Sequence, residues 1–190
     1  SNGTYTSVRG GISNYFKGGV SFDNLPNNIA YIINAATGYL KLYDGTDVFD
    51  SINTNSQVYH IEPLRGTTKF VVYNKLNSHQ TSFLIHDYEN STTLESEAID
   101  GSIGDIIYNK YNNKILVAVN SYPGMVAIYN HAGVKEGEIP LPPSDVNHNY
   151  MRKMYINPDG LLFLTSNMKK PESDSQPRLL ICNASDYSNM

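Results

Sequence analysis

The run NNIAYII at residues 27–33 is the first of four apolar segments that recur along this chain. The segments that follow it are KFVVY at 69–73, KILVAV at 114–119 and GLLFLT at 160–165. Each leads, after a polar turn, to a second run that ends in Asp or Asn. These end residues are Asp44, Asp87, Asn130 and Asn183, of which the first three are 43 residues apart and the last follows 53 residues later. A period of this size is typical of repeat proteins. The spacing predicts a repeat β protein and by itself indicates no function.

Each repeat divides into short apolar strands separated by turns rich in Gly, Asn, Asp and Pro, which is the pattern of antiparallel hairpins. No long segment has a helical apolar period, so we expect little helix. The expected strands are 29–34, 39–43 and 48–52 in the first repeat, 59–62, 69–74, 82–87 and 94–98 in the second, 105–109, 114–119, 126–130 and 135–139 in the third, and 154–157, 161–166 and 178–183 in the fourth.

The fourth repeat carries the most specific motif, MYINPDGLLFLT at 154–165. This strand, Pro-Asp-Gly turn and second strand resemble the units of YVTN/WD40-type β-propellers, and the periodicity extends the resemblance over residues 29–183. The chain has no Trp, and therefore no Trp-Asp signature. The resemblance implies an all-β fold: a β-propeller, or a propeller fragment, of about four four-stranded antiparallel blades. It implies a scaffold for binding and brings no catalytic residue.

We expect one domain over residues 1–190, with units at about 24–57, 58–99, 104–140 and 152–190. The last unit has only three expected strands, which would leave an open hydrogen-bonding edge. The stretch TYTSVR at 4–9, within residues 1–23, is a candidate ring-closing strand. The alternative is that the chain is part of a longer propeller.

The middle strands are apolar at consecutive positions, which indicates that both of their faces are covered. We therefore expect burial of six residues in these strands and of their neighbours. The six residues are Phe70, Val72, Leu116, Ala118, Leu162 and Leu164.

Composition narrows the classes of partner. A net charge of −4 and a pI near 5.7 argue against nucleic acid and anionic membrane surfaces. The content of charged residues, 17%, is low, which we interpret as typical of a secreted or cell-surface protein. The one cysteine, Cys182, lies in an apolar run and is expected to be a buried thiol. No apolar stretch is long enough to predict insertion into a membrane.

Catalytic and metal motifs are weak. The chain has no Gly-x-Ser-x-Gly elbow and no phosphate-binding loop, and its five His residues are scattered. The pairs Asp44 with Asp47 and Asp100 with Asp105 offer calcium-type oxygens but do not match a calcium loop. The sequence therefore predicts no catalytic residue, metal or cofactor. The innermost strands of the blades offer mainly Tyr59, Ile61, Ile106, Tyr108, Met154 and Ile156.

Two long loops are the predicted binding surface. Residues 167–177 form the insertion in the last repeat, and residues 140–150 connect the third and fourth repeats. Insertions in repeat folds often decorate one binding face. The candidate binding residues in these loops are Asn147, His148, Tyr150, Lys169, Lys170, Glu172 and Asp174. Asn90, in the triplet Asn-Ser-Thr, is the candidate glycosylation acceptor.

Three functions stay open. The first is a non-catalytic module that binds a protein or a glycan through these loops. The second is a structural subunit or fragment, completed by further blades or by a second copy that joins the open blade edge. The third is a lyase or hydrolase with a site in a central channel, for which the innermost strands offer few catalytic side chains.

Overall fold

A computed structural model describes residues 30–34, 39–43, 48–53, 61–121, 124–140, 149–168 and 176–188 of the chain. These residues form antiparallel β-sheets, and no helix occurs among them. The predicted all-β class is therefore confirmed for this part of the chain. The same residues contain no helix long and apolar enough to cross a membrane.

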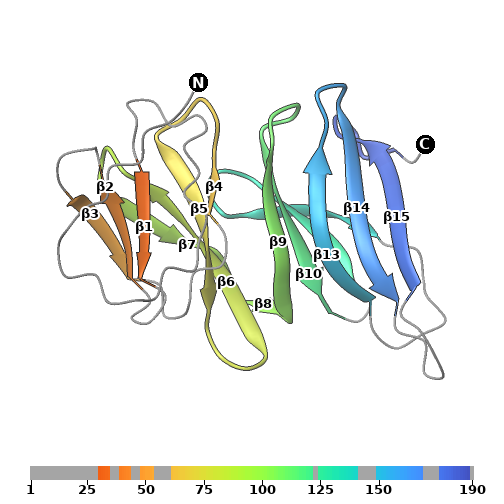
Figure 1. The fold of residues 1–190 in the computed structure, drawn as a ribbon, viewed down its shortest axis with the longest axis horizontal. Coiled ribbons are helices and arrows are strands. Elements are labelled where there is room, and N and C mark those ends of the chain that lie inside the picture. The colour runs from red at the N-terminus through yellow and green to blue at the C-terminus, as the bar shows by residue number, and fades with distance from the viewer. Residues whose placement is uncertain are drawn as a thin grey trace, which may run out of the picture.

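Four sheets follow one another in chain order across the molecule (Figure 1). The first consists of β1 (Ala30–Asn34), β2 (Tyr39–Tyr43) and β3 (Val48–Asn53). The second consists of β4 (Ile61–Pro63), β5 (Lys69–Lys75), β6 (Gln80–Asp87), β7 (Thr92–Glu95) and β8 (Ile99–Asp100). The third consists of β9 (Ser102–Asn109), β10 (Lys114–Asn120), β11 (Met125–Tyr129) and β12 (Lys135–Pro140). The fourth consists of β13 (Asn149–Ile156), β14 (Leu161–Met168) and β15 (Gln176–Asn183).

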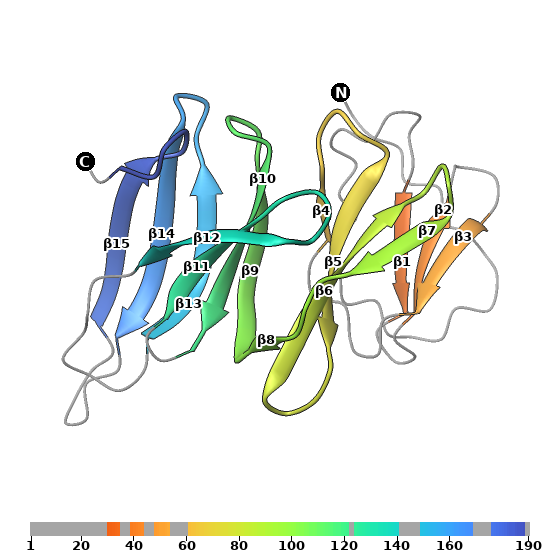
Figure 2. The same ribbon diagram turned by 180° about the vertical axis from the view of Figure 1, so that it is seen from behind.

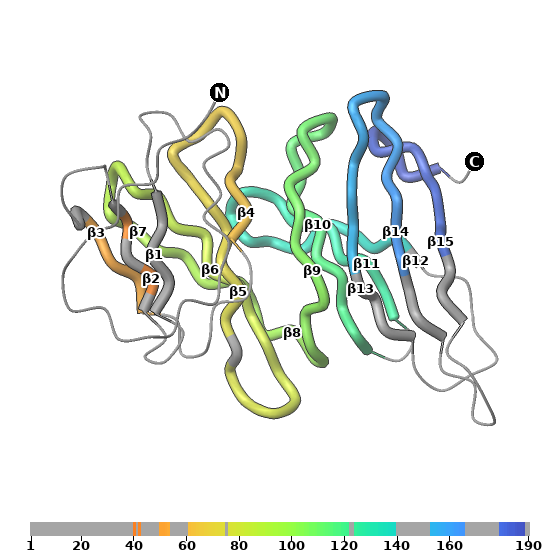
Figure 3. Tube along the Cα trace, in the orientation of Figure 1, coloured from red at the N-terminus to blue at the C-terminus, as the bar shows by residue number. Residues whose placement is uncertain are grey.

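The first strands of successive sheets lie together. β4 contacts β9, and β9 contacts β13. Figure 1 shows β9 and β13 side by side, while β12 crosses in front of its sheet in the reverse view (Figure 2). The tube drawing follows the same row from the first sheet to the fourth (Figure 3). The described sheets form an open row and do not close into a ring.

The observed strands match the expected ones with two informative differences. The outer strand predicted at 94–98 is split into β7 and β8, which both pair with β6. Ser96 causes the break, because its backbone N–H donates to the Phe83 carbonyl while its hydroxyl accepts from the Phe83 N–H at 3.1 Å. In addition, β13 begins at Asn149 rather than 154, since it pairs with the full length of β14.

Three apolar clusters fill the spaces between successive sheets. The first lies between sheets one and two, the second between sheets two and three, and the third between sheets three and four. In the second cluster the rings of Phe83 and Tyr129 meet edge to face, with centroids 4.9 Å apart. Burial raises the pKa of Tyr129 to about 12. Cys182 is buried in the third cluster, and burial raises the pKa of its thiol.

The expected burial of middle strands holds for the third sheet, and in the second it holds for residues 70–72 but not for Lys69 and Tyr73, which are half-buried. Phe70 and Val72 pack toward the first sheet, while Val71 between them packs toward the third. In β10, five consecutive residues from Ile115 to Val119 are buried.

The expectation was wrong for one face of the fourth sheet. Leu162 and Leu164 are buried against the third sheet, but their neighbours Leu161, Phe163 and Thr165 are only half-buried. The physical reason is that the described part of the chain places no further sheet on that side.

A half-buried and a buried carboxylate join the first strands of neighbouring sheets. The Glu62 carboxylate in β4 accepts from the Tyr108 N–H in β9 at 2.9 Å. The Asp105 carboxylate in β9 accepts from the Met154 N–H in β13 at 2.8 Å, and it also meets the Lys153 ammonium at 3.3 Å. Such bonds link consecutive sheets at fixed heights along their first strands.

Candidate binding surfaces

The loop that follows β12 finishes, and the loop between β14 and β15 starts and finishes, at one end of the fourth sheet. Asn149 pairs with Met168, and Met168 pairs with Gln176. This register brings together the start of β13, the end of β14 and the start of β15. The segments 141–148 and 169–175 are therefore attached to the same rim of one sheet.

Most candidate residues of these loops lie outside the described residues. These are Asn147, His148, Lys169, Lys170, Glu172 and Asp174. Tyr150 lies in β13, where it pairs with Asn167. The expected strand at 4–9 and the candidate pair Asp44 with Asp47 also lie outside the described residues.

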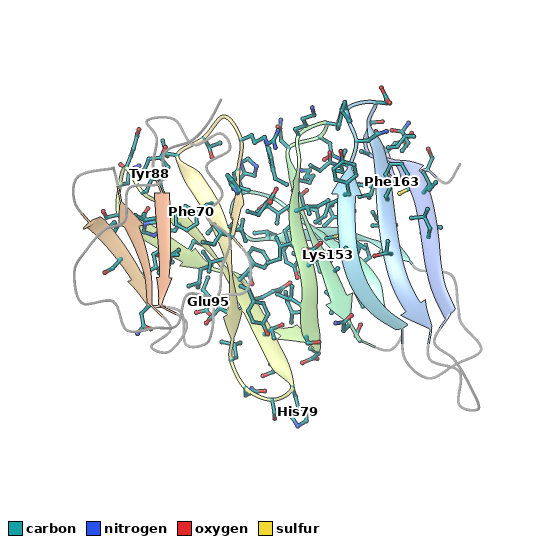
Figure 4. The ribbon with its side chains drawn as sticks, viewed as in Figure 1. Phe70, His79, Tyr88, Glu95, Lys153 and Phe163 are labelled. Carbon is teal, nitrogen blue, oxygen red and sulfur yellow. The ribbon has the colours of Figure 1, made fainter. Side chains whose placement is uncertain are left out.

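The described histidines do not converge. His79 is exposed at the tip of the β5–β6 hairpin (Figure 4). His131 is half-buried in the turn after β11, and burial together with Lys69 and Lys114 lowers its imidazole pKa. His86 is buried between the first and second sheets, while His60 and His148 lie outside the described residues.

His86 is the centre of a short polar series. Its Nε2 is 2.7 Å from Oδ2 of Asp50 in β3, and its Nδ1 is 2.8 Å from the Thr93 hydroxyl in β7. Its ring lies against Phe70, with centroids 5.2 Å apart. An acid, an imidazole and a hydroxyl in this order are the three groups of a nucleophilic catalytic triad. Here the imidazole is 2% exposed, so the series acts as a polar link between two sheets.

The two carboxylates of the candidate calcium pair, Asp100 and Asp105, do not face a common site. Asp100 is exposed and accepts from the Gln80 side chain at 3.0 Å, whereas Asp105 is buried and bonded to the fourth sheet. Within the described ranges, no group of three or more His, Cys, Asp or Glu is placed to hold a metal ion.

Asn90 is exposed in the turn after β6. Its side-chain amide donates to the Asp87 carboxylate at 3.0 Å. This hydrogen bond is the main cause that lowers the pKa of Asp87 below its ordinary value of 3.8.

Reasoning from the sequence named none of the residues of one further surface. The uncovered side of the fourth sheet, which we call the outer face, carries apolar side chains from all three strands. Its members are Tyr155, Leu161, Phe163, Leu179 and Ile181. Tyr155 is 60% exposed and Leu179 59%, and the ring centroids of Tyr155 and Phe163 are 6.3 Å apart. The consecutive apolar residues of the two runs were the available signal, but they had indicated cover on both sides.

A comparison of the chain with protein-family models and with curated proteins found no match.

Proposed function

We propose that this chain is a non-catalytic binding module of the β-propeller type, which presents two loops at one rim to a protein or a glycan. The observation that carries the proposal is the register Asn149–Met168–Gln176, which places the end of the first loop and both ends of the second at one rim of a paired sheet.

The blade arrangement supports the propeller part of the proposal. Successive antiparallel sheets follow the chain order, and their first strands are neighbours. The 43-residue spacing of Asp44, Asp87 and Asn130 falls within the range for propeller repeats. Repeat folds commonly bind through loops gathered on one side.

The loop residues suit a polar partner. Lys169, Lys170, Glu172 and Asp174 supply charges of both signs, and Asn147, His148 and Tyr150 supply adaptable hydrogen bonds. Prolines in both loops reduce the conformational freedom lost when a partner binds. We place the protein outside the cell or on its surface, where a protein or glycan partner would meet it.

The test is to replace residues 169–175 by a Gly-Ser turn, which keeps the paired residues Met168 and Gln176. Wild type and variant are applied to a glycan array and to a displayed library of extracellular proteins. We expect the variant to keep its melting temperature and lose the wild-type hits. The matched control is Val134→Lys, at an apolar residue that is 56% exposed in the turn before β12. Retention of every hit by the shortened variant would contradict the proposal.

A second candidate is a structural subunit completed by further blades or by a second copy. The exposed outer face favours it, because monomeric soluble proteins seldom expose a large contiguous apolar patch. The two candidates are compatible, since they use different surfaces of the fourth sheet. A channel lyase or hydrolase has the least support.

For a protein secreted by a eukaryotic cell, we propose Asn90 as a glycosylation site. It is exposed and lies in an Asn-Ser-Thr triplet. A mass shift on enzymatic deglycosylation that disappears in Asn90→Gln would support this assignment.

A further inference from the structure

The apolar residues of the outer face form one continuous patch across the three strands of the fourth sheet. The register places Tyr155, Phe163 and Ile181 side by side in one row, with Phe163 in the middle strand. Leu161 lies before Phe163 on the same face of β14, and Leu179 lies before Ile181 on the same face of β15, because side chains of a strand alternate between its faces. Phe163 therefore has apolar neighbours on both sides across the sheet.

Two polar side chains beside this patch already have partners within the chain. The Thr165 hydroxyl accepts from the Lys153 N–H at 3.1 Å and donates to the Lys153 carbonyl at 3.2 Å. The Lys153 ammonium meets the Asp105 carboxylate at 3.3 Å. A polar group that is buried without a partner is costly. Covering this face would leave neither the hydroxyl nor the ammonium group unpaired.

Within the chain, the corresponding faces of the second and third sheets are covered by the apolar face of the next sheet. Val71 lies beneath the third sheet and Val126 beneath the fourth, and both are 0% exposed. The residues of the fourth sheet that cover Val126 include Leu162 and Leu164. Contact between two apolar sheet faces is therefore the way in which this repeat buries such positions.

The surface that covers the outer face must itself be apolar, reach across three strands and add no unpaired charge. The outer face of a second copy meets each of these requirements, since it is the same surface. Its apolar side chains would meet apolar side chains. The two Lys153 ammonium groups are each held by Asp105 of their own chain, so they bring no unpaired charge into the contact.

We infer that the outer face of one copy packs against the outer face of a second copy. Because both copies use the same surface, the contact is isologous and closes at two chains related by a two-fold axis. Stacked sheets lie about 10 Å apart, so the side chains of the two faces interdigitate and exclude water. Burial of the exposed Tyr155 and Leu179 side chains contributes to the hydrophobic free energy of association.

This inference deepens the second candidate function and rests on it, since it names the second copy as the completing partner and the outer face as its contact. It does not depend on the loops at 141–148 and 169–175. The loop-shortened variant should therefore remain paired. If that variant loses its partner and stays paired, both proposals stand.

The first experiment measures mass by light scattering coupled to size-exclusion chromatography, together with sedimentation velocity, on the 190-residue chain at about 1 to 100 µM. We expect the wild type to have twice the single-chain mass of 21.2 kDa. Leu179→Lys and Tyr155→Lys should each raise the dimer dissociation constant roughly 100-fold, because each would bury unpaired ammonium groups. Far-UV circular dichroism of the variants verifies that they fold, since both residues are mostly exposed.

The second experiment distinguishes an isologous contact from one in which the outer face meets some other surface of the second copy. Fluorescently labelled wild type is titrated with unlabelled Leu179→Lys. In an isologous pair one of the two contacting faces is altered, so the mixed dissociation constant should be roughly 10-fold above that of the wild type. In the other arrangement the variant would present the surface that binds the wild-type outer face unaltered, and it would bind as tightly as wild type.

Val134→Lys is the matched control, since Val134 is similarly exposed but lies outside the outer face. It should leave the mass at two chains. Four results would each overturn the inference: a single-chain mass for the wild type at about 100 µM, an unchanged dissociation constant in both lysine variants, mixed pairing as tight as that of the wild type, or an open-ended polymer. None of these results would bear on the loop experiment, so the two proposals can fail separately.

Discussion

Several buried or half-buried polar side chains join one sheet to the next. Glu62 and Asp105 accept hydrogen bonds from backbone N–H groups of the following sheet, and Asp50 meets His86 across the first interface. A buried carboxylate without such a partner would be strongly unfavourable. These hydrogen bonds therefore favour one order of the sheets and one relative position along their strands. Apolar packing alone is less specific for that arrangement.

Gly101 connects the second sheet to the third through a conformation that other residues rarely adopt. Its φ is +110°, and a Cβ placed there would be 2.5 Å from the Asn120 carbonyl oxygen. We expect Gly101→Ala to lower the free energy of unfolding by roughly 3 kcal/mol, because backbone strain adds to a clash with backbone. Urea unfolding at pH 7 measures the loss.

Gly66→Ala is the control for strain alone. Gly66 has a φ of +80°, and nothing lies within 4 Å of its added Cβ. We expect a loss of about 1 kcal/mol. Equal losses at the two positions would show that the close approach of Asn120 has no energetic weight.

Asp87 predicts an acid-sensitive contribution to stability. Its pKa is lowered in the folded state, first by the Asn90 amide and further by the Thr68 hydroxyl. A lowered folded pKa adds stability above the ordinary value of 3.8, and this stability is lost as pH falls below it. We expect Asn90→Ala to destabilise the protein more at pH 7 than at pH 3 in urea unfolding.

Thr67→Ala is the control for this pH dependence, because the Thr67 hydroxyl bonds only backbone groups of Leu64 and Lys69. Its loss should be similar at the two pH values. An Asn90→Ala loss that is also independent of pH would contradict the role of Asn90 in lowering the Asp87 pKa.

At the scale of an element, side chains on the two faces of the fourth sheet should contribute unequally to the free energy of unfolding. Leu162 is fully buried in the third cluster. We expect Leu162→Ala to cost about 2–5 kcal/mol through lost burial and a residual cavity. Leu179→Ala, on the outer face, should cost less than about 1 kcal/mol within a single chain.

Both substitutions are compared by urea unfolding in the Tyr155→Lys background, which is expected to separate the two copies. This background restricts the measurement to contacts within one chain. A loss below about 1 kcal/mol for Leu162→Ala would mean that the face toward the third sheet is not a tightly packed core.

At the scale of the whole molecule, the described sheets form a row in which each sheet covers one face of the sheet before it. The two ends of this row therefore expose different faces. Pairing of two copies makes stability depend on protein concentration. We expect the wild-type melting temperature to rise by about 5 °C or more between roughly 1 and 100 µM. The melting temperature of Leu179→Lys should stay constant over this range, and the same slope in both proteins would argue against pairing through the outer face.

The strands, their turns and the antiparallel class follow from local signals. Apolar runs of strand length, Asn-Pro-Asp-Gly at 157–160 and the 43-residue spacing are all visible in the sequence. The site is harder to predict from the sequence, because the exposure of the outer face depends on which sheet packs against which. The runs at 161–164 and 179–182 are as apolar as those at 115–119, so composition could not distinguish an uncovered strand from a covered one.

The sequence likewise did not predict which residues far apart in the chain contact one another. Asp50 and His86, Glu62 and Tyr108, and Gly101 and Asn120 meet across turns and sheet boundaries. Nothing in the local pattern around any of them selects its partner. Periodicity determines which residues form strands, since it depends on neighbours along the chain. Only the packing of sheet on sheet decides which face is buried, which carboxylate finds an N–H and which surface is left for a second molecule.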